Sequence, residues 1–280
     1  MIIVKLQGGI GNQMFQYAIG KHIAILNNME LKLDISSFEK DSLNRKYELH
    51  NFNISESIAS EKEIKKIINK RFFAFSQNNT IIKQRFFEYD AEVLKKYNNN
   101  IYLDGFWQSE KYFFQIKNII QKEFTLKYAN DFNKNFEHIL NKTETLNSVA
   151  VHVRRGDYVN SKFGQNNYRN IHSEGYYKKA FEIISKKTSA PVYFMFSDDI
   201  EWCKNEFKKI KDLIFIESHK PHEDLILMSL CKHQITANSS FSWWAAWLNN
   251  NPYKTIIATD KWFYNNWNTI NLISENWTKI

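Results

Sequence analysis

The second half of the chain alternates between short apolar runs and amphipathic stretches, and this alternation constrains the fold more than any other feature. It predicts strands at 148–153, 191–197, 213–217, 233–237 and 254–258. Between them it predicts a loop at 154–172 and helices at 173–187, 199–209, 222–231 and 240–250. Such alternation favours a parallel sheet with helices on both faces, and ligands are then expected beyond the carboxyl ends of the strands.

The first half has the pattern of a smaller α/β unit. A strand at Met1–Val4 leads through a glycine-rich turn into a helix over about 12–28, and strands are predicted at 30–35 and 101–107 with a helix at 109–123. The polar segment 36–100 is predicted to be helical, and 125–147 has the charged, amphipathic pattern of a helical connection. We therefore predict two α/β domains, 1–145 and 146–280.

Composition narrows the class of protein. The chain has 280 residues, 43% of them apolar, which is enough for a substantial core. It has no apolar run long enough to span a membrane and no signal-peptide pattern at its start, so we expect a cytoplasmic protein. The net charge of +8 is compatible with nucleic acid, with a phosphorylated substrate, or with peripheral contact at the inner face of a membrane.

Two arginines follow the strand at 148–153 directly. Arg154 and Arg155 would emerge at its carboxyl end, where their planar donor groups suit the oxygens of a diphosphate. Asp157 is placed to orient one of them. The alternative is a surface ion pair, which has no reason to occupy this position in the sheet.

A second anion site is predicted where the strand at 233–237 meets the next helix. Ser239 and Ser240 would offer hydroxyls and backbone amides at the start of that helix. The three tryptophans that follow, Trp243, Trp244 and Trp247, are better explained by core packing than by sugar stacking.

Carboxylates and cysteines give no metal pattern. Asp198 and Asp199 lack the spacing of an Asp-x-Asp clasp, and Ser197 or Asp198 is expected to cap the helix that follows, so we predict no divalent cation. Cys203 and Cys231 are expected to be buried thiols. Asp224, in the first turn of its helix, could be a partner of the helix dipole or could accept the N–H groups of guanine.

The turn Gly8-Gly9-Ile10-Gly11-Asn12 matches neither a P-loop nor a dinucleotide fingerprint. Its glycines permit a tight turn, and the helix after it has unpaired amides that favour anions. The residues alone leave a functional loop and a simple turn equally open.

Three segments together carry a resemblance to a known family: Gly8 to Ala18, His152-Val153-Arg154-Arg155-Gly156-Asp157-Tyr158, and Asn238-Ser239-Ser240-Phe241-Ser242-Trp243-Trp244. In this order they resemble the α-1,2-fucosyltransferases of glycosyltransferase family 11. The arginine segment is also similar to that of α-1,6- and protein O-fucosyltransferases. The resemblance implies inverting, metal-independent transfer of L-fucose from GDP-β-L-fucose to the 2-hydroxyl of a galactoside.

The resemblance also implies a GT-B-type fold of two Rossmann-like domains facing each other across a cleft, with an acceptor-side domain at 1–145 and a GDP-fucose-binding domain at 146–280. By position, Arg154 and Arg155 would engage the diphosphate and the leaving GDP, and Asp157 and His172 are candidates for the base. We add Asp198 to the predicted donor-binding residues. The others are Gly9, Gly11, Asn12, His152, Arg154, Arg155, Asp224, Asn238, Ser239, Ser240 and Phe241.

The implied acceptor is a galactoside-containing oligosaccharide or lipid-linked glycan, and by analogy the pathway is that of O-antigen or capsule; no cofactor is expected. Three alternatives stay open at this stage. One is a fucosyltransferase of another linkage, α-1,6 or to protein. The second is a basic nucleic-acid-binding protein, although no dense basic stripe or nucleic-acid module is present, and the third is a non-catalytic sugar-binding module.

Overall fold

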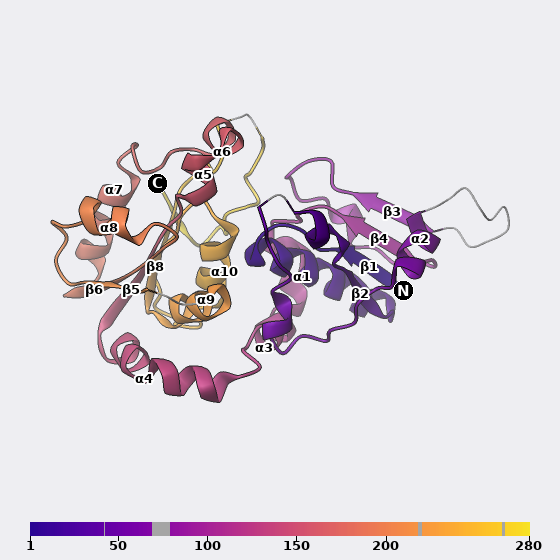
Figure 1. Cartoon of the computed structure of the whole chain (residues 1–280), viewed down its shortest axis with the longest axis horizontal. Coiled ribbons are helices and arrows are strands. Elements are labelled where there is room, and N and C mark those ends of the chain that lie inside the picture. The colour runs from indigo at the N-terminus through magenta and orange to yellow at the C-terminus, as the bar shows by residue number, and fades with distance from the viewer. Residues whose placement is uncertain (42, 69–78, 218–219, 265–266) are drawn as a thin grey trace. The chain divides into compact units, whose positions relative to one another are not determined.

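A computed structural model describes residues 1–41, 43–68, 79–217, 220–264 and 267–280 (Figure 1). The chain divides into two compact units, Met1–Lys127 with Ile270–Leu272, and Tyr128–Thr269 with Ile273–Ile280. The predicted boundary after residue 145 differs from this division, which places helix α4 (Ala129–Thr145) in the second unit. The reason is packing, because α4 buries Phe132 and Phe136 and contacts α9 and β5 of that unit.

The first unit is built on a four-stranded sheet in the order β2-β1-β4-β3. Its strands are β1 (Ile2–Lys5), β2 (Leu31–Asp34), β3 (Thr80–Lys83) and β4 (Ile101–Asp104), and every pairing is parallel. Helix α1 (Ile10–Asn27) connects β1 to β2 and is buried over most of its length. The central strand β1 is almost wholly apolar, which agrees with its burial on both faces.

The prediction of a helical segment at 36–100 is wrong for most of that segment. Its described residues contain a single α-helix, α2 (Glu61–Ile68), the unpredicted strand β3, and 3₁₀ turns at Ser36–Lys40, Leu49–Asn51 and Ala91–Val93; residues 69–78 lie outside the description. The predicted helix at 109–123 likewise begins as two 3₁₀ turns, and only α3 (Lys117–Glu123) is α-helical. The segment 36–100 is mostly polar and offers few apolar side chains for an α-helix to bury. In 109–123 the buried residues Phe113, Ile116 and Ile120 do follow helical spacing, and this pattern does not distinguish a 3₁₀ turn from the start of an α-helix.

The second unit is built on a six-stranded sheet in the order β10-β9-β8-β5-β6-β7, again with parallel pairing throughout. All five predicted strands are confirmed: β5 (Asn147–Val153), β6 (Pro191–Ser197), β7 (Leu213–Phe215), β8 (His233–Ile235) and β9 (Ile256–Ala258). The short strand β10 (Thr278–Lys279) was not predicted. The helices are α7 (Tyr176–Lys187), α8 (Ile200–Glu206), α9 (Pro221–Leu230) and α10 (Ser240–Leu248).

The region predicted as a loop at 154–172 contains two short helices, α5 (Gly156–Asn160) and α6 (Lys162–Asn167). They are too short to show a hydrophobic period in the sequence. Strand β5 before them divides its side chains between two faces. Val149, Val151 and Val153 pack into a core with α7, whereas the ring of His152 lies on the other face, against Phe241 of α10.

In each sheet the order of strands reverses at one point. The chain passes from β5 to β6 and β7 on one side and then returns to β8 on the other side of β5. In the smaller sheet the same reversal falls between β1 and β4. Loops at the carboxyl ends of such strand pairs diverge, and that is where open parallel sheets bind ligands.

The tryptophans of α10 are packing residues, as predicted. Trp243 and Trp244 are 0% exposed and their ring centroids lie 5.2 Å apart. Among the described residues, no helix has both the length and the apolar character needed to cross a membrane.

Replacement of Trp243 by alanine should lower the free energy of unfolding by about 3–5 kcal/mol, because a large buried ring leaves a cavity. Urea titration followed by circular dichroism measures this change. The matched control is Tyr253→Ala in the same unit, at a side chain that is 86% exposed, where the change should stay within about 0.5 kcal/mol. Equal losses in the two variants would contradict the packing assignment.

Candidate active site

Arg154 leaves the carboxyl end of β5 and is held between two carboxylates. Its Nη2 donates to Oδ1 of Asp157 at 2.7 Å, and its Nη1 lies 3.0 Å from Oδ2 of Asp198. Asp198 follows β6, the neighbouring strand of the sheet. The predicted orientation of one arginine by Asp157 is therefore observed, and the partner is Arg154.

Arg155 is held differently from Arg154. Its Nε donates to Oδ2 of Asp199 at 3.0 Å, and its guanidinium lies 4.0 Å from the centre of the Trp202 ring. The stack on the indole fixes the plane of the guanidinium and adds cation–π attraction. Sequence analysis missed Trp202, because the contact joins α8 to the loop after β5 and leaves no local pattern.

The two aspartates after β6 have separate tasks. Asp199 caps α8 by accepting a hydrogen bond from the backbone N–H of Trp202, so the expectation that Ser197 or Asp198 is the cap was wrong. Asp198 instead accepts from the backbone N–H of Arg155 at 2.8 Å, in addition to its contact with Arg154. Its direct contact with a donor substrate stays a prediction.

The start of α10 lies beside the arginine loop, by which we mean Arg154 and Arg155 and the residues that follow them up to Tyr158. Ser239 caps the helix by accepting from the N–H of Phe241, and Ser240 is the first helical residue. The hydroxyl of Tyr158 donates to the carbonyl of Asn238 at 2.9 Å, and the rings of His152 and Phe241 lie 5.2 Å apart. The loops after β5 and β8 are thus in contact at the reversal of strand order.

Asn238 is 1% exposed and forms hydrogen bonds with two other segments of the chain. Its Nδ2 donates to the carbonyls of Arg169 and Trp262. The structure therefore shows Asn238 shaping the loop before α10, and a direct role in donor binding stays a prediction.

Two histidines stand next to Arg154. His152 is 5% exposed, and burial together with the charge of Arg154 lowers its pKa to about 3, so it is neutral near pH 7. His172 has Nε2 2.9 Å from the carbonyl oxygen of Arg154, a pairing that requires the proton on Nε2. Burial also lowers the pKa of His172. The role of base predicted for Asp157 or His172 remains a prediction.

Asp224 lies in the first turn of α9 and is half-buried. Burial, and secondly the charge of Glu223, raises the pKa of this carboxyl to about 7. A carboxylate that is costly to ionise in the unliganded protein is a candidate for binding hydrogen-bond donors of a ligand.

The part of the chain that the structure describes contains no group of three or more His, Cys, Asp and Glu side chains arranged to hold a metal ion. His219, His222, Cys231 and His233 lack the spacing of metal ligands in the sequence, and His219 lies outside the described residues. Both cysteines are buried thiols, as predicted.

In the first unit the glycine turn joins β1 to α1. Gly8 has φ of +80°, and a Cβ at this position would lie 2.6 Å from Nδ2 of Asn12, so Gly8 is the position that requires glycine. The predicted residues Gly9 and Gly11 are the N-cap and a buried first-turn residue of α1. Oδ1 of Asn12 accepts from Nε2 of Gln108 at 2.7 Å, a partner that the sequence did not reveal.

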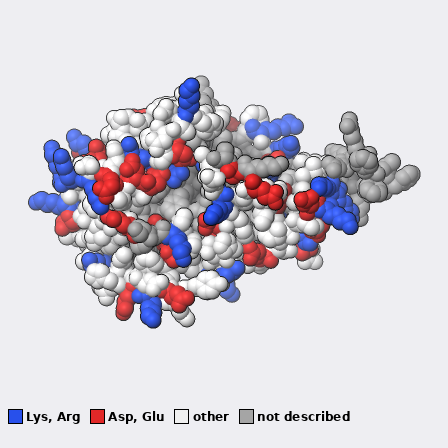
Figure 2. Space-filling view, viewed as in Figure 1, with Lys and Arg blue, Asp and Glu red and all other residues white. Residues whose placement is uncertain are grey.

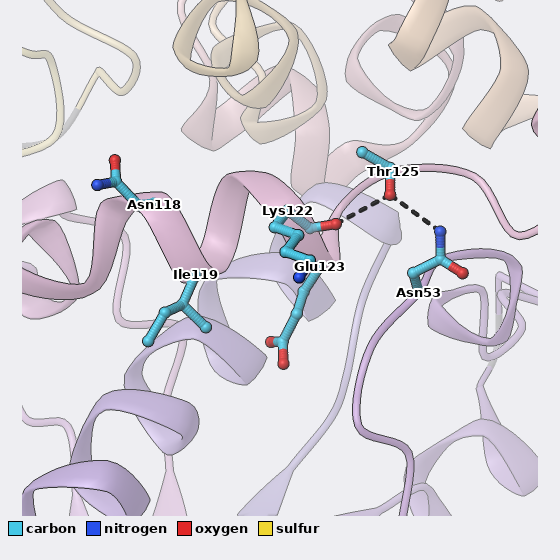
Figure 3. A pocket seen from close by; sticks show the side chains of 6 residues that line it. All are labelled: Asn53, Asn118, Ile119, Lys122, Glu123 and Thr125. Atoms are coloured by element: carbon cyan, nitrogen blue, oxygen red, sulfur yellow. Dashed lines mark hydrogen bonds between the residues drawn. The ribbon is translucent and has the colours of Figure 1, made fainter.

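An open hollow of about 630 Å³ in the first unit lies beside α3 (Figure 3). It contains none of the predicted site residues, and Glu123 at its edge is already bound to Tyr17 and Lys21. The hollow is lined by Asn53, Asn118, Ile119, Lys122, Glu123 and Thr125.

Comparison with known proteins identifies the family. The model of the family described as Glycosyl transferase family 11 matches residues 1–280. The chain belongs to glycosyltransferase family 11. It is 35% identical to an alpha-1,2-colitosyltransferase of Escherichia coli, over 100% of this chain and 99% of that one.

More distant relatives agree with this assignment. The O-antigen biosynthesis glycosyltransferase WbnK of Escherichia coli is 29% identical over 98% of this chain and 99% of its own length. The galactoside 2-alpha-L-fucosyltransferase Sec1 of Mus musculus is 23% identical over 95% of this chain and 73% of its own length.

A solved structure confirms the expected fold. The NodZ alpha-1,6-fucosyltransferase, in crystals soaked with GDP-fucose, superposes with a TM-score of 0.53 at 13% identity, over 88% of this chain and 91% of that one. The family 11 glycosyltransferase therefore has the GT-B-type α/β fold. On the face shown in Figure 2, Lys and Arg side chains are interspersed with Asp and Glu, and no basic stripe of a nucleic-acid-binding protein is visible there.

Gly156, the first residue of α5, makes a testable contribution to the arginine loop. A Cβ at this position would overlap with the carboxylate of Asp198. Alanine at the start of a helix is normally harmless, but here Gly156→Ala should lower the free energy of unfolding by about 1–3 kcal/mol in thermal or urea denaturation. The same change made in an Asp198→Ala background should cost much less, because the obstructing carboxylate is gone; full additivity of the two changes would contradict the proposed clash.

Proposed function

We propose that this family 11 glycosyltransferase transfers L-fucose from GDP-β-L-fucose to the 2-hydroxyl of a galactoside, with inversion at the anomeric carbon and without a divalent cation. The observation that carries the proposal is the pairing of Arg154 and Arg155 with the start of α10 at the reversal of strand order between β5 and β8. These groups offer positive charge and hydrogen-bond donors to a diphosphate. The names of the relatives support the α-1,2 linkage and the galactoside acceptor.

The proposed reaction develops charge where these residues lie. The bond between the anomeric carbon and the β-phosphate oxygen breaks, and its electron pair stays on GDP. The oxygen of the acceptor 2-hydroxyl bonds to the anomeric carbon from the opposite face, and its proton passes to a base, for which Asp157 and His172 are the candidates. The arginines and the amides of α10 stabilise the negative charge on GDP as it forms, the task that a metal ion performs in other enzymes.

His152 and Asp224 are assigned to the guanine of GDP. Neutral His152 lies on β5, next to Phe241 of α10. The carboxylate of Asp224 can accept both the N1 and N2 hydrogens of guanine, and these bonds would replace the hydration that burial removes.

The name of one relative points to a second candidate for the sugar donor. One relative with 35% identity over the whole chain is a colitosyltransferase, and colitose is 3-deoxy-L-fucose. GDP-colitose is therefore the alternative donor for the same site and the same linkage. A role in O-antigen synthesis follows from the relative WbnK and is part of the proposal.

The deciding experiment incubates the full-length protein with GDP-fucose or GDP-colitose and lactose in the presence of EDTA, followed by linkage analysis. Transfer to the 2-hydroxyl of galactose is expected, and the ratio of kcat/KM values identifies the donor. Absence of both transfer and GDP release with either donor would overturn the enzyme proposal. Activity that appears only with Mn²⁺ would overturn the metal-free mechanism, and a 1,6 linkage would overturn the assigned regiochemistry.

Replacement of Arg155 by alanine should lower kcat by about 100-fold or more, because one preorganised cation facing the leaving GDP is lost. Steady-state kinetics with the better donor measures the effect, and circular dichroism checks the fold. The control is Lys179→Ala, which removes one positive charge from an exposed position on α7 and should leave kcat unchanged. Near-wild-type turnover in Arg155→Ala would remove this residue from the mechanism.

The raised pKa of Asp224 predicts a pH dependence of GDP binding. The ionised carboxyl accepts the guanine N–H groups and the protonated carboxyl does not, so affinity should rise with pH through about 7. Only about one carboxyl in ten is ionised one unit below the pKa, so GDP should bind roughly tenfold more weakly at pH 6 than above pH 8.

Isothermal titration calorimetry over this range measures the pH profile. Asp224→Asn should abolish the step and weaken GDP binding, whereas the exposed control Glu182→Gln should retain both the step and the affinity. An unchanged profile in Asp224→Asn would show that another group titrates.

A further inference from the structure

A side-chain amide beside the glycine turn has a buried polar atom with no hydrogen-bond partner in the described part of the chain. Gln108 is 7% exposed; its Nε2 donates to Oδ1 of Asn12 at 2.7 Å, while its Oε1 is buried and has no hydrogen-bond partner among the described residues. A buried carbonyl oxygen without a donor is costly unless a ligand or water supplies one. We propose that the Asn12–Gln108 pair binds a hydroxyl group of a sugar substrate; the identity of that sugar rests on the function proposed above.

The pair is held in place by other amides of α1. Gln16, which is 0% exposed, accepts from the backbone N–H of Gln7 and donates to the carbonyl of Gly105, so the segment after β4 is tied to α1 at Gly105 as well as at Gln108. Gln13, also 0% exposed, donates to the carbonyls of Gly8 and Lys46 and thereby fixes the turn itself. Such buried amides position a site that would otherwise depend on mobile loops.

The position of the pair in the fold agrees with ligand binding. Asn12 follows β1 and Gln108 follows β4, the two strands between which the order of the smaller sheet reverses. The site therefore corresponds in topology to the arginine loop and α10 in the larger sheet. Gly8 has a positive φ that favours glycine, and a Cβ there would lie 2.6 Å from Nδ2 of Asn12.

The donors and acceptors of the pair select a hydroxyl over a phosphate. Nδ2 of Asn12 is a donor and Oε1 of Gln108 is an acceptor, and a hydroxyl both accepts and donates. If the oxygen and nitrogen atoms of both amides are exchanged, the pair again offers one donor and one acceptor, so a hydroxyl group is still the ligand that satisfies both. An ionised phosphate only accepts, and it would leave the carbonyl of Gln108 unpaired.

Two further buried donors lie in the segments that follow β3 and β4. Nε1 of Trp107 and Nε2 of Gln84 are buried without a hydrogen-bond partner among the described residues, and Trp107 has φ of +55°. Oε1 of Gln84 accepts from the N–H groups of Phe106 and Trp107 and so supports this uncommon backbone conformation.

The hydroxyl could belong to the transferred sugar or to the galactoside, and one experiment separates the two. Saturation-transfer NMR of the full-length protein is measured with L-fucose and with methyl β-D-galactoside, neither of which carries a phosphate. Gln108→Met removes both polar atoms at similar volume, and Gln108→Glu is a second variant that keeps an acceptor. The control is Gln115→Met at an exposed position in the same unit. Thermal unfolding verifies the fold of each variant.

Gln108→Met should weaken binding of one of the two sugars by about 10-fold or more and should raise its KM in transfer assays by a similar factor, without changing the affinity for GDP. Loss of the fucose signal assigns the site to the donor sugar, and loss of the galactoside signal assigns it to the acceptor. Unchanged signals for both sugars in folded Gln108→Met and Gln108→Glu, or a matching loss of GDP affinity, would overturn the proposal. A further outcome separates the two proposals. If the wild-type protein transfers sugar from neither donor but binds one of the free sugars, and Gln108→Met loses that binding signal, the proposed function fails and the hydroxyl site stands.

Discussion

The reversal of strand order in two parallel sheets is the constraint on which the candidate site depends. Parallel pairing brings all carboxyl ends to one edge, and the reversal sends the connections after two neighbouring strands to opposite sides. In the larger sheet this places Arg154 next to the start of α10, although 84 residues separate β5 from β8 in the register Val149↔His233. Without that pairing, neither segment alone would form an anion site.

Neighbouring carboxylates hold the two arginines in fixed orientations, so their N–H groups are positioned before a ligand binds. Asp157 and Asp198 bind Arg154, while Asp199 and the Trp202 ring hold Arg155. An unpaired half-buried guanidinium would be costly, and ordering it only when substrate binds would cost side-chain entropy. The same loop requires Gly156, because a side chain there would displace Asp198. Fixed orientation and close packing are thus a single arrangement.

Sequence reasoning found the parts of this site that have a local cause. An apolar run followed by two arginines, or by two serines and a helix, is visible in the sequence, and β5, β8 and α10 were predicted accordingly. Trp202 and Gln108 were missed because their contacts join segments far apart in the chain, and the Asn12–Gln108 bond spans 96 positions. Strand β3 was missed because an edge strand of half-exposed residues carries little apolar signal.

The two sheets use the same topological position for different chemistry, and the difference follows from charge. The C-terminal sheet presents cations and helix amides, which suit a leaving group that becomes more negative. At the reversal in the N-terminal sheet, the last residues of β1 and β4, Lys5 and Asp104, neutralise each other in an ion pair of 3.4 Å, and Asn12 and Gln108 present neutral amides. A sugar whose anomeric carbon gains positive charge during transfer would be destabilised by a nearby cation, since the Coulomb repulsion is large in a site of low polarity. A neutral donor–acceptor pair can hold its hydroxyls without that penalty, so the amides are suited to the sugar and the arginines to the phosphates.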